Sequence, residues 1–161
     1  MLRRGRCDGF TYVGILIVVA ILGLSLAAAG SVWSFAARRD KEAELIFVGD
    51  QFREAIGRYR ASGGGGFQFP RELTDLLNDD RSPVPRHYIR KIYLDPMTGK
   101  DDWQLIRTND GGIIGIASNS SAKPIKRAKF ERQDAEFEDK DCYCDWQFVY
   151  QLQSYRPTLA H

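Results

Sequence analysis

The sequence predicts an α+β protein in which a long N-terminal transmembrane helix continues into a small head with an antiparallel β-sheet. Three observations predict this class. The apolar residues of the 161-residue chain crowd near its N-terminus, although the net charge of the whole chain is only +2. A helical pattern continues beyond that apolar run. Short apolar segments, separated by turn residues, fill the remainder.

The first element is an apolar run over residues 10–37, which contains no Asp, Glu, Lys or Arg. A helix of about 20 apolar residues spans a bilayer, so this run is long enough to do so. A cleaved secretory signal is the alternative, because arginines precede the run and the alanines at 27–29 resemble a cleavage site. The apolar run continues past that site, which favours a retained anchor. Basic residues flank both ends, so charge alone leaves the orientation open.

The helix is expected to continue through residues 38–61, where Gly49 and Gly57 are the only weak points. Apolar residues recur there at helical spacing and form one stripe: Leu45, Val48, Phe52, Ile56 and Tyr59. Charged residues, including Glu42 and Arg53, occupy the other faces. We therefore expect Phe52→Ala to be costly and Arg53→Ala to cost little stability. The glycines at 63–66 end the helix.

The head is expected to contain one short helix and three strands. Residues 70–77 begin with proline and read as a short helix. Two strands, over 103–108 and 112–117, are joined by the hairpin turn Asn109-Asp110-Gly111. A third strand follows at 146–152. The segment between the second and third strands is rich in charge and is predicted to be loop.

The residues around Gly9 and Phe10 carry a resemblance to a known family. A short basic leader, then glycine, then phenylalanine, then an unbroken apolar helix resembles the N-terminal signal of type IV prepilins and pseudopilins. In that family a prepilin peptidase cuts after the glycine and methylates the new terminal phenylalanine. The resemblance implies cleavage between Gly9 and Phe10 and N-methylation of Phe10. It also implies a leader at 1–9, a transmembrane and assembly helix at 10–37, and a pilin-like periplasmic head at 38–161 that includes the outer half of the helix.

The function that this resemblance implies is that of a structural subunit of a type II secretion pseudopilus, which drives protein export. The implied partners are the prepilin peptidase, other pseudopilin subunits, the inner-membrane secretion platform and the membrane, with no nucleic acid. The implied location is the bacterial inner membrane, crossed once, with the head in the periplasm. Two alternatives remain open: a minor type IV pilin of a pilus or DNA-uptake machine, and a single-pass anchored periplasmic binding module. No enzyme is predicted, since the sequence lacks the catalytic motifs Gly-x-Ser-x-Gly and His-Glu-x-x-His and a phosphate-binding loop.

One position departs from the family pattern. The family usually has glutamate four residues after the terminal phenylalanine, where it pairs with the terminal amine of a neighbouring subunit, and this sequence has Gly14. A buried amine without a counter-charge is costly. The departure therefore favours a special position, such as the filament tip, over that of a repeating major subunit.

Two further features of the head, an acidic segment and a pair of cysteines, could bind a metal or form a disulfide. The stretch Leu94-Asp95-Pro96-Met97-Thr98-Gly99 is similar to a loop of major pseudopilins, whose heads bind calcium. Calcium could use carboxylates from an acidic segment, namely Asp134, Glu136, Asp139, Asp141 and Asp145. The favoured alternative is a solvated acidic loop, because no EF-hand spacing is present. Cys142 and Cys144 are either bridged or free, and no histidine is spaced to complete a known zinc motif.

Overall fold

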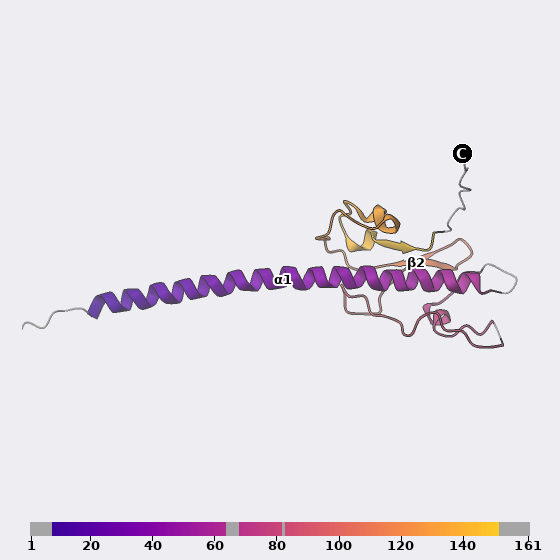
Figure 1. Cartoon of the computed structure of the whole chain (residues 1–161), viewed down its shortest axis with the longest axis horizontal. Helices are drawn as coiled ribbons and strands as arrows, with labels where there is room; N and C mark the ends of the chain where they lie inside the picture. Colours follow the sequence, from indigo (N-terminus) through magenta and orange to yellow (C-terminus); the bar gives the residue numbers. More distant parts are fainter. Residues whose placement is uncertain (1–7, 64–67, 82, 152–161) are drawn as a thin grey trace, which may run out of the picture. The chain divides into compact units, whose positions relative to one another are not determined.

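A computed structural model describes residues 8–63, 68–81 and 83–151, apart from the side chains of residues 8–11 and 26–32. The chain divides into two compact units, Met1–Arg39 and Asp40–His161. Helix α1, Asp8–Ala61, contributes to both units and has 54 residues (Figure 1). Its end agrees with the helix limit predicted from the glycines at 63–66.

The first unit consists of the N-terminal part of α1. Among the described residues, no helix combines the length and the apolar character that crossing a membrane requires. The predicted transmembrane helix is thus not found in the part of the chain that the structure describes. The predicted α+β class with an antiparallel sheet is confirmed, as the second unit shows. The side chains of residues 26–32, inside the predicted span 10–37, lie outside that part.

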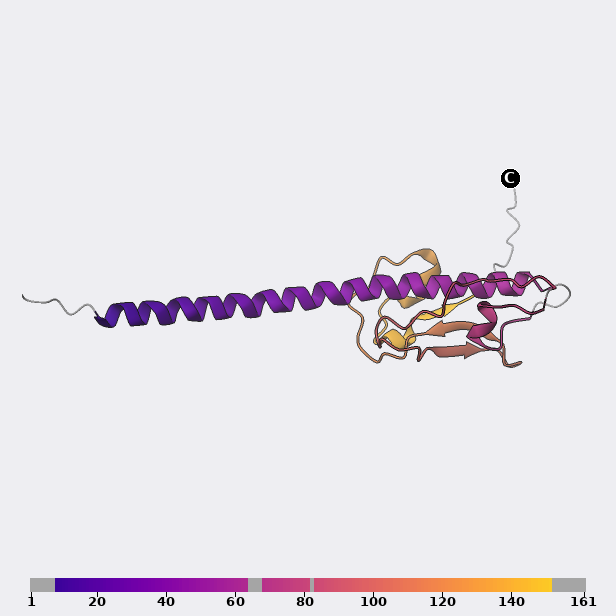
Figure 2. The ribbon, with the colours of Figure 1, turned by 90° about the horizontal axis from the view of Figure 1, so that it is seen from below.

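The second unit holds a three-stranded antiparallel sheet with the order β1-β2-β3 (Figure 2). The strands are β1, Gln104–Arg107, β2, Ile113–Ala117, and β3, Gln147–Val149. The predicted hairpin joins β1 and β2, and Gly111 has a φ of 83° that favours glycine. Directly after β3, Tyr150 donates its N–H to the carbonyl of Ile114. Within the described residues the third strand is shorter than the predicted 146–152, of which residue 152 lies outside the described part.

The core of the second unit forms between α1 and the sheet. The predicted stripe is confirmed, since Leu45, Val48, Phe52, Ile56 and Tyr59 are all buried. Gly49 and Gly57, the two predicted weak points of the helix, allow close packing instead. A Cβ at Gly49 would collide with the ring of Phe148, and one at Gly57 would collide with the ring of Tyr150. Glycine therefore lets α1 approach the C-terminal part of the head.

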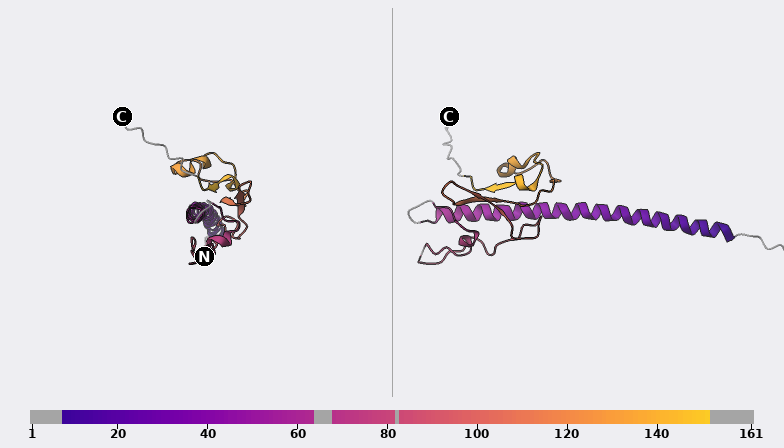
Figure 3. Two further views of the ribbon diagram at one scale, coloured as in Figure 1. Left: turned by 90° about the vertical axis from the view of Figure 1, so that its right-hand side faces the viewer. Right: turned by 180° about the vertical axis from the view of Figure 1, so that it is seen from behind.

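Three short 3-10 helices complete this unit. The predicted helix at 70–77 is reduced to η1, Leu73–Leu76. The charged segment predicted to be loop contains η2, Arg132–Phe137, and η3, Tyr143–Asp145. These two helices and η1 approach α1 from different sides (Figures 1 and 3). Phe137 stacks on Trp146 at 5.4 Å between ring centroids, so the charged segment also supplies aromatic core.

Candidate functional site

The most unusual surface in the molecule lies on α1 between Tyr12 and Ser25, here called the apolar segment. Every side chain in it is exposed, and its large apolar residues keep 51% to 73% of their surface accessible. The exposed residues follow one another along the chain, so they cover every face of the helix. An ordinary surface helix of a globular protein instead confines its apolar residues to one stripe. The apolar segment therefore needs an apolar environment around it, which lipid or neighbouring helices can provide.

The backbone of the apolar segment suits such an environment. An α-helix satisfies its own peptide groups, which is a requirement within lipid or within a helix bundle. Ser25 also donates its hydroxyl proton to the carbonyl of Ile21 at 2.8 Å, so this polar side chain needs no outside partner. The aromatic side chains of Trp33 and Phe35 are likewise exposed, at 79% and 61%.

The predicted processing residues lie at the start of α1. Gly9 and Phe10 fall within its first turn, and their side-chain surroundings are outside the described residues. Gly14 lies in the apolar segment, and a Cβ built on it meets no atom within 4 Å. The chain itself therefore has room for a larger side chain at this position. Cleavage at Gly9 and methylation of Phe10 stay predictions.

Asp134, the first of the five predicted calcium ligands, is engaged in an ion pair. Its carboxylate is almost fully buried and lies 2.7 Å from the guanidinium of Arg53. Arg53 also contacts Asp50 at 2.6 Å. Burial raises the pKa of the Asp50 carboxyl, and the positive charge of Arg53 opposes that rise. Arg53 thus connects α1 to η2, and the expectation that Arg53→Ala costs little is wrong, because the change leaves Asp134 buried without its partner.

The other four predicted ligands are all exposed and do not converge with Asp134. Asp141 forms an ion pair with Lys123 at 2.8 Å, and the hydrogen bond from Lys123 lowers the pKa of the Asp141 carboxyl. Asp139 has a φ of 56° in the turn that follows η2. Among the described residues, the one group of three or more possible ligands consists of Cys142, Cys144 and Asp145. The calcium site stays a prediction without geometric support.

Of the two alternatives for the cysteine pair in the head, the structure has the bridged one. Cys142 and Cys144 form a disulfide, and their Cα atoms are 5.2 Å apart. An extended strand would separate residues i and i+2 by more than this, and the η3 turn brings them within bridging range. Tyr143, between them, is fully buried.

Glu42 is a residue whose role the sequence did not reveal. It lies on α1 with 3% of its surface exposed. Its carboxylate accepts the N–H groups of Ile125 and Lys126 and the hydroxyl of Tyr143, the last at 2.8 Å. Glu42 therefore holds the loop after β2 and the η3 turn against α1. Its partners are more than 80 residues away in sequence, so no local pattern could have identified them.

A second such residue is Asp79 in the polar loop after η1. It accepts hydrogen bonds from the guanidinium of Arg81 and from the hydroxyl of Tyr88 at 2.8 Å. The hydrogen bonds from Arg81, more than any other cause, hold the pKa of Asp79 well below its usual range. Arg81 also donates to the carbonyl of Tyr59 at 2.8 Å and so occupies an acceptor near the C-terminal end of α1.

Comparison with known proteins does not identify a family for the chain. No protein-family model, no curated protein and no solved structure matches the chain.

Proposed function

We propose that the chain is a pilin-like structural subunit of a type II secretion pseudopilus, a filament that supports protein export. In this proposal the segment 10–37 anchors the chain once in the bacterial inner membrane and later packs against the same segment of other subunits. The head lies in the periplasm. The partners are the prepilin peptidase, the other pseudopilin subunits and the inner-membrane secretion platform.

One observation carries the proposal: α1 exposes apolar side chains on every face over residues 12–25, directly after the Gly9-Phe10 pair. An apolar surface of this extent needs a partner, and a helix that is apolar all round can exchange lipid contacts for helix contacts. The second half of the same helix supports the proposal too, because it is covered by a folded head. A filament subunit requires both properties.

The proposal is tested by the N-terminus of the mature chain. We expect mass spectrometry of the chain from its native host to show a terminus at N-methylated Phe10. Gly9→Val should leave the leader attached, because the glycine precedes the predicted cut. Gly5→Val is the matched control, since it changes a leader glycine away from the cut and should be processed normally. A wild-type terminus elsewhere, or normal trimming of the Gly9→Val variant, would contradict the proposal.

The alternative of an anchored binding module also has a specific observation in its favour. An open pocket of about 680 Å³ lies between α1 and the C-terminal part of the head, lined by residues that include Asp50, Glu54, Gln133 and Tyr150. Its volume is in the range of small-molecule sites. Retention of the full leader in the mature chain, together with saturable binding of a small solute that Glu54→Gln weakens, would favour this alternative.

A further inference from the structure

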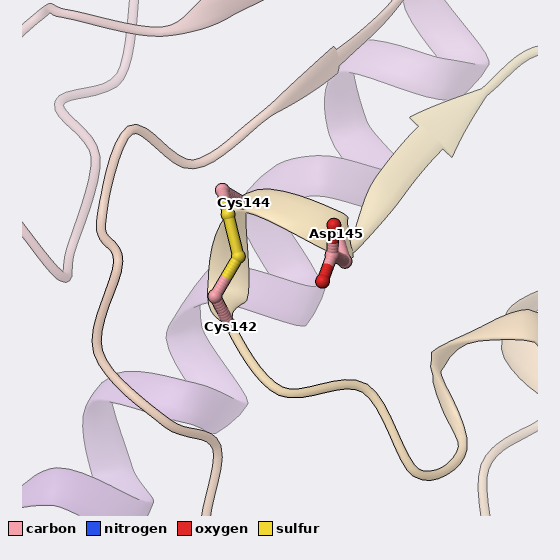
Figure 4. A group of neighbouring side chains, drawn as sticks. All are labelled: Cys142, Cys144 and Asp145. Carbon is pink, nitrogen blue, oxygen red and sulfur yellow. A yellow bond between two sulfur atoms is a disulfide. The ribbon is translucent and has the colours of Figure 1, made fainter.

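The η3 turn brings three groups with metal-binding chemistry together. The sulfur atoms of Cys142 and Cys144 and a carboxylate oxygen of Asp145 all lie within 4.8 Å of one another (Figure 4). Cys142 directly precedes η3 and Asp145 ends it, so this turn brings the two residues together. The disulfide keeps Cys144 beside them. Both cysteines are half-buried and Asp145 is exposed, so the group is open to solvent on one side.

Contacts that do not involve sulfur hold this turn in place. The N–H of Asp145 donates to the carbonyl of Cys142 at 3.2 Å, and the N–H of Tyr143 donates to the carbonyl of Ala122 at 3.1 Å. The ring of Tyr143 is fully buried and packs edge-on against Trp146, with 5.2 Å between the centroids. Its hydroxyl donates to Glu42. Opening the disulfide therefore leaves the two thiols and the carboxylate close together.

We propose that this group, once its disulfide is reduced, is a binding site for a thiophilic divalent cation such as Zn²⁺. A dithiol or phosphine reductant supplies two electrons, and two protons give the two thiols. Cation binding then releases those protons and leaves two thiolates and the Asp145 carboxylate as ligands, with water in the remaining position. Zinc sites with three protein ligands and a water are a known arrangement.

The ligand set selects the class of cation. Thiolates favour zinc and other thiophilic metals, whereas calcium and magnesium prefer sets made of oxygen. The three ligands together carry three negative charges, which favours a divalent cation. In the oxidised chain the sulfurs are joined to each other and cannot be thiolates, so the disulfide controls whether the site exists. This inference does not depend on the filament proposal, because it uses only contacts within residues 40–151.

The test uses Co²⁺ as a spectroscopic substitute for Zn²⁺. The full chain in detergent micelles, with Cys7→Ser in every sample to remove the remaining thiol, is titrated with Co²⁺ after reduction by a phosphine and again in its oxidised form. We expect the reduced chain to bind one Co²⁺ with thiolate-to-metal charge-transfer absorption in the near ultraviolet, and to lose the ion to Zn²⁺. The oxidised chain should show no such absorption.

Substitutions show whether the Asp145 carboxylate is a ligand or whether the two thiols alone bind the cation. Asp145→Asn should weaken binding at least about tenfold, since even groups that only hydrogen-bond to metal ligands contribute that much. Asp141→Asn is the matched control, because Asp141 is a neighbouring exposed acid outside the group, and its affinity should match the parent chain. Cys144→Ser should abolish the absorption. Equal Co²⁺ affinity of the reduced and oxidised chains, or of the Asp145→Asn and Asp141→Asn variants, would overturn the proposal, as would unfolding of the head on reduction.

Discussion

The two parts of α1 are both rich in apolar residues, but one part buries its stripe and the other exposes its apolar side chains. In the part of α1 within the head, the five residues of the stripe each keep 7% or less of their surface exposed: Leu45, Val48, Phe52, Ile56 and Tyr59. From Tyr12 to Ser25 the apolar residues occur on all faces and every one is exposed. A stripe can be covered by the folded head of its own chain, as it is here. An apolar surface on all sides can be covered only from all sides, by lipid or by several other helices.

The charged side chains of α1 are also distributed differently between its two parts. The run 10–37 has no charged side chain, whereas the part of α1 in the head carries Glu42 and Arg53, which are used as partners for distant segments. One part of the helix thus contacts its own chain, whereas we propose that the other contacts lipid or other subunits. The predictions below probe each side of this comparison, from the largest expected effect to the smallest.

Phe52→Ala tests the stripe and should have the largest effect. Phe52 is fully buried and packs edge-on against Tyr93 and Trp103. We expect the free energy of unfolding to fall by about 3–5 kcal/mol, as for other buried aromatic residues cut to alanine. The measurement is urea unfolding of the full chain in micelles, followed by near-ultraviolet circular dichroism. Phe47→Ala is the matched control, since Phe47 lies on the same helix and is 58% exposed. Equal losses for the two variants would show that the stripe does not hold the head.

Arg53→Ala tests whether the charged side of α1 also holds the head. It leaves the carboxylate of Asp134 buried without a partner, and loss of one member of a buried ion pair costs about 3 kcal/mol or more. The same unfolding experiment measures it. Glu54→Ala, which removes a pair between exposed side chains, should change the free energy of unfolding by less than about 1 kcal/mol. Adding Asp134→Asn to Arg53→Ala should restore part of the loss, and no restoration would speak against an unpaired charge as its cause.

Asp79→Asn tests the contact between the polar loop and the end of α1, and its effect should depend on pH. The carboxylate has a lowered pKa in the folded chain, so it stabilises the fold above the unfolded pKa of about 3.9 and loses this effect as pH falls further. At pH 7 we expect Asp79→Asn to lower the free energy of unfolding by about 2 kcal/mol. The difference in the free energy of unfolding between variant and parent should become smaller below pH 4. A difference that does not change with pH down to pH 2 would contradict this role of the charge.

Gly14→Glu tests the apolar segment through filament or secretion yield, and here no gain in yield is expected. The chain has room for the side chain, but an unpaired acid in lipid or between helices costs about 2.5–3.5 kcal/mol on insertion scales. If the subunit occupies a special position, the new carboxylate gains no partner and filament or secretion yield does not rise. Gly14→Ala controls for the helix propensity of glycine and should be tolerated. A yield for Gly14→Glu clearly above that of Gly14→Ala would identify a repeating subunit instead.

The parts of the fold that follow from local pattern could be predicted. The helical spacing of the stripe and the Asn109-Asp110-Gly111 turn determined the buried face of α1 and the hairpin, and both are found. The 3-10 helices η2 and η3 were missed because each is too short to show a period, and because charged neighbours mask Phe137 and Tyr143.

The polar contacts could not be predicted from the sequence. Glu42 and Arg53 have partners more than 80 residues away in sequence. Asp95, which begins the turn that ends at Gly99, accepts a hydrogen bond from the hydroxyl of Ser118 at 2.6 Å. A charged residue next to an apolar stripe looks the same in sequence whether it faces water or a buried partner. Its role depends on tertiary packing, which local spacing does not encode.

The central claim is that the apolar segment is a surface for contact with other subunits, and photo-cross-linking tests it most directly. A benzophenone amino acid replaces Leu16, which is 51% exposed in the apolar segment, or Phe47, which is exposed on α1 in the head. After illumination of the native host, the Leu16 position should give cross-links to other filament subunits, and these should disappear when the filament does not assemble. Adducts to lipid alone at position 16, in cells that assemble the filament, would contradict the account.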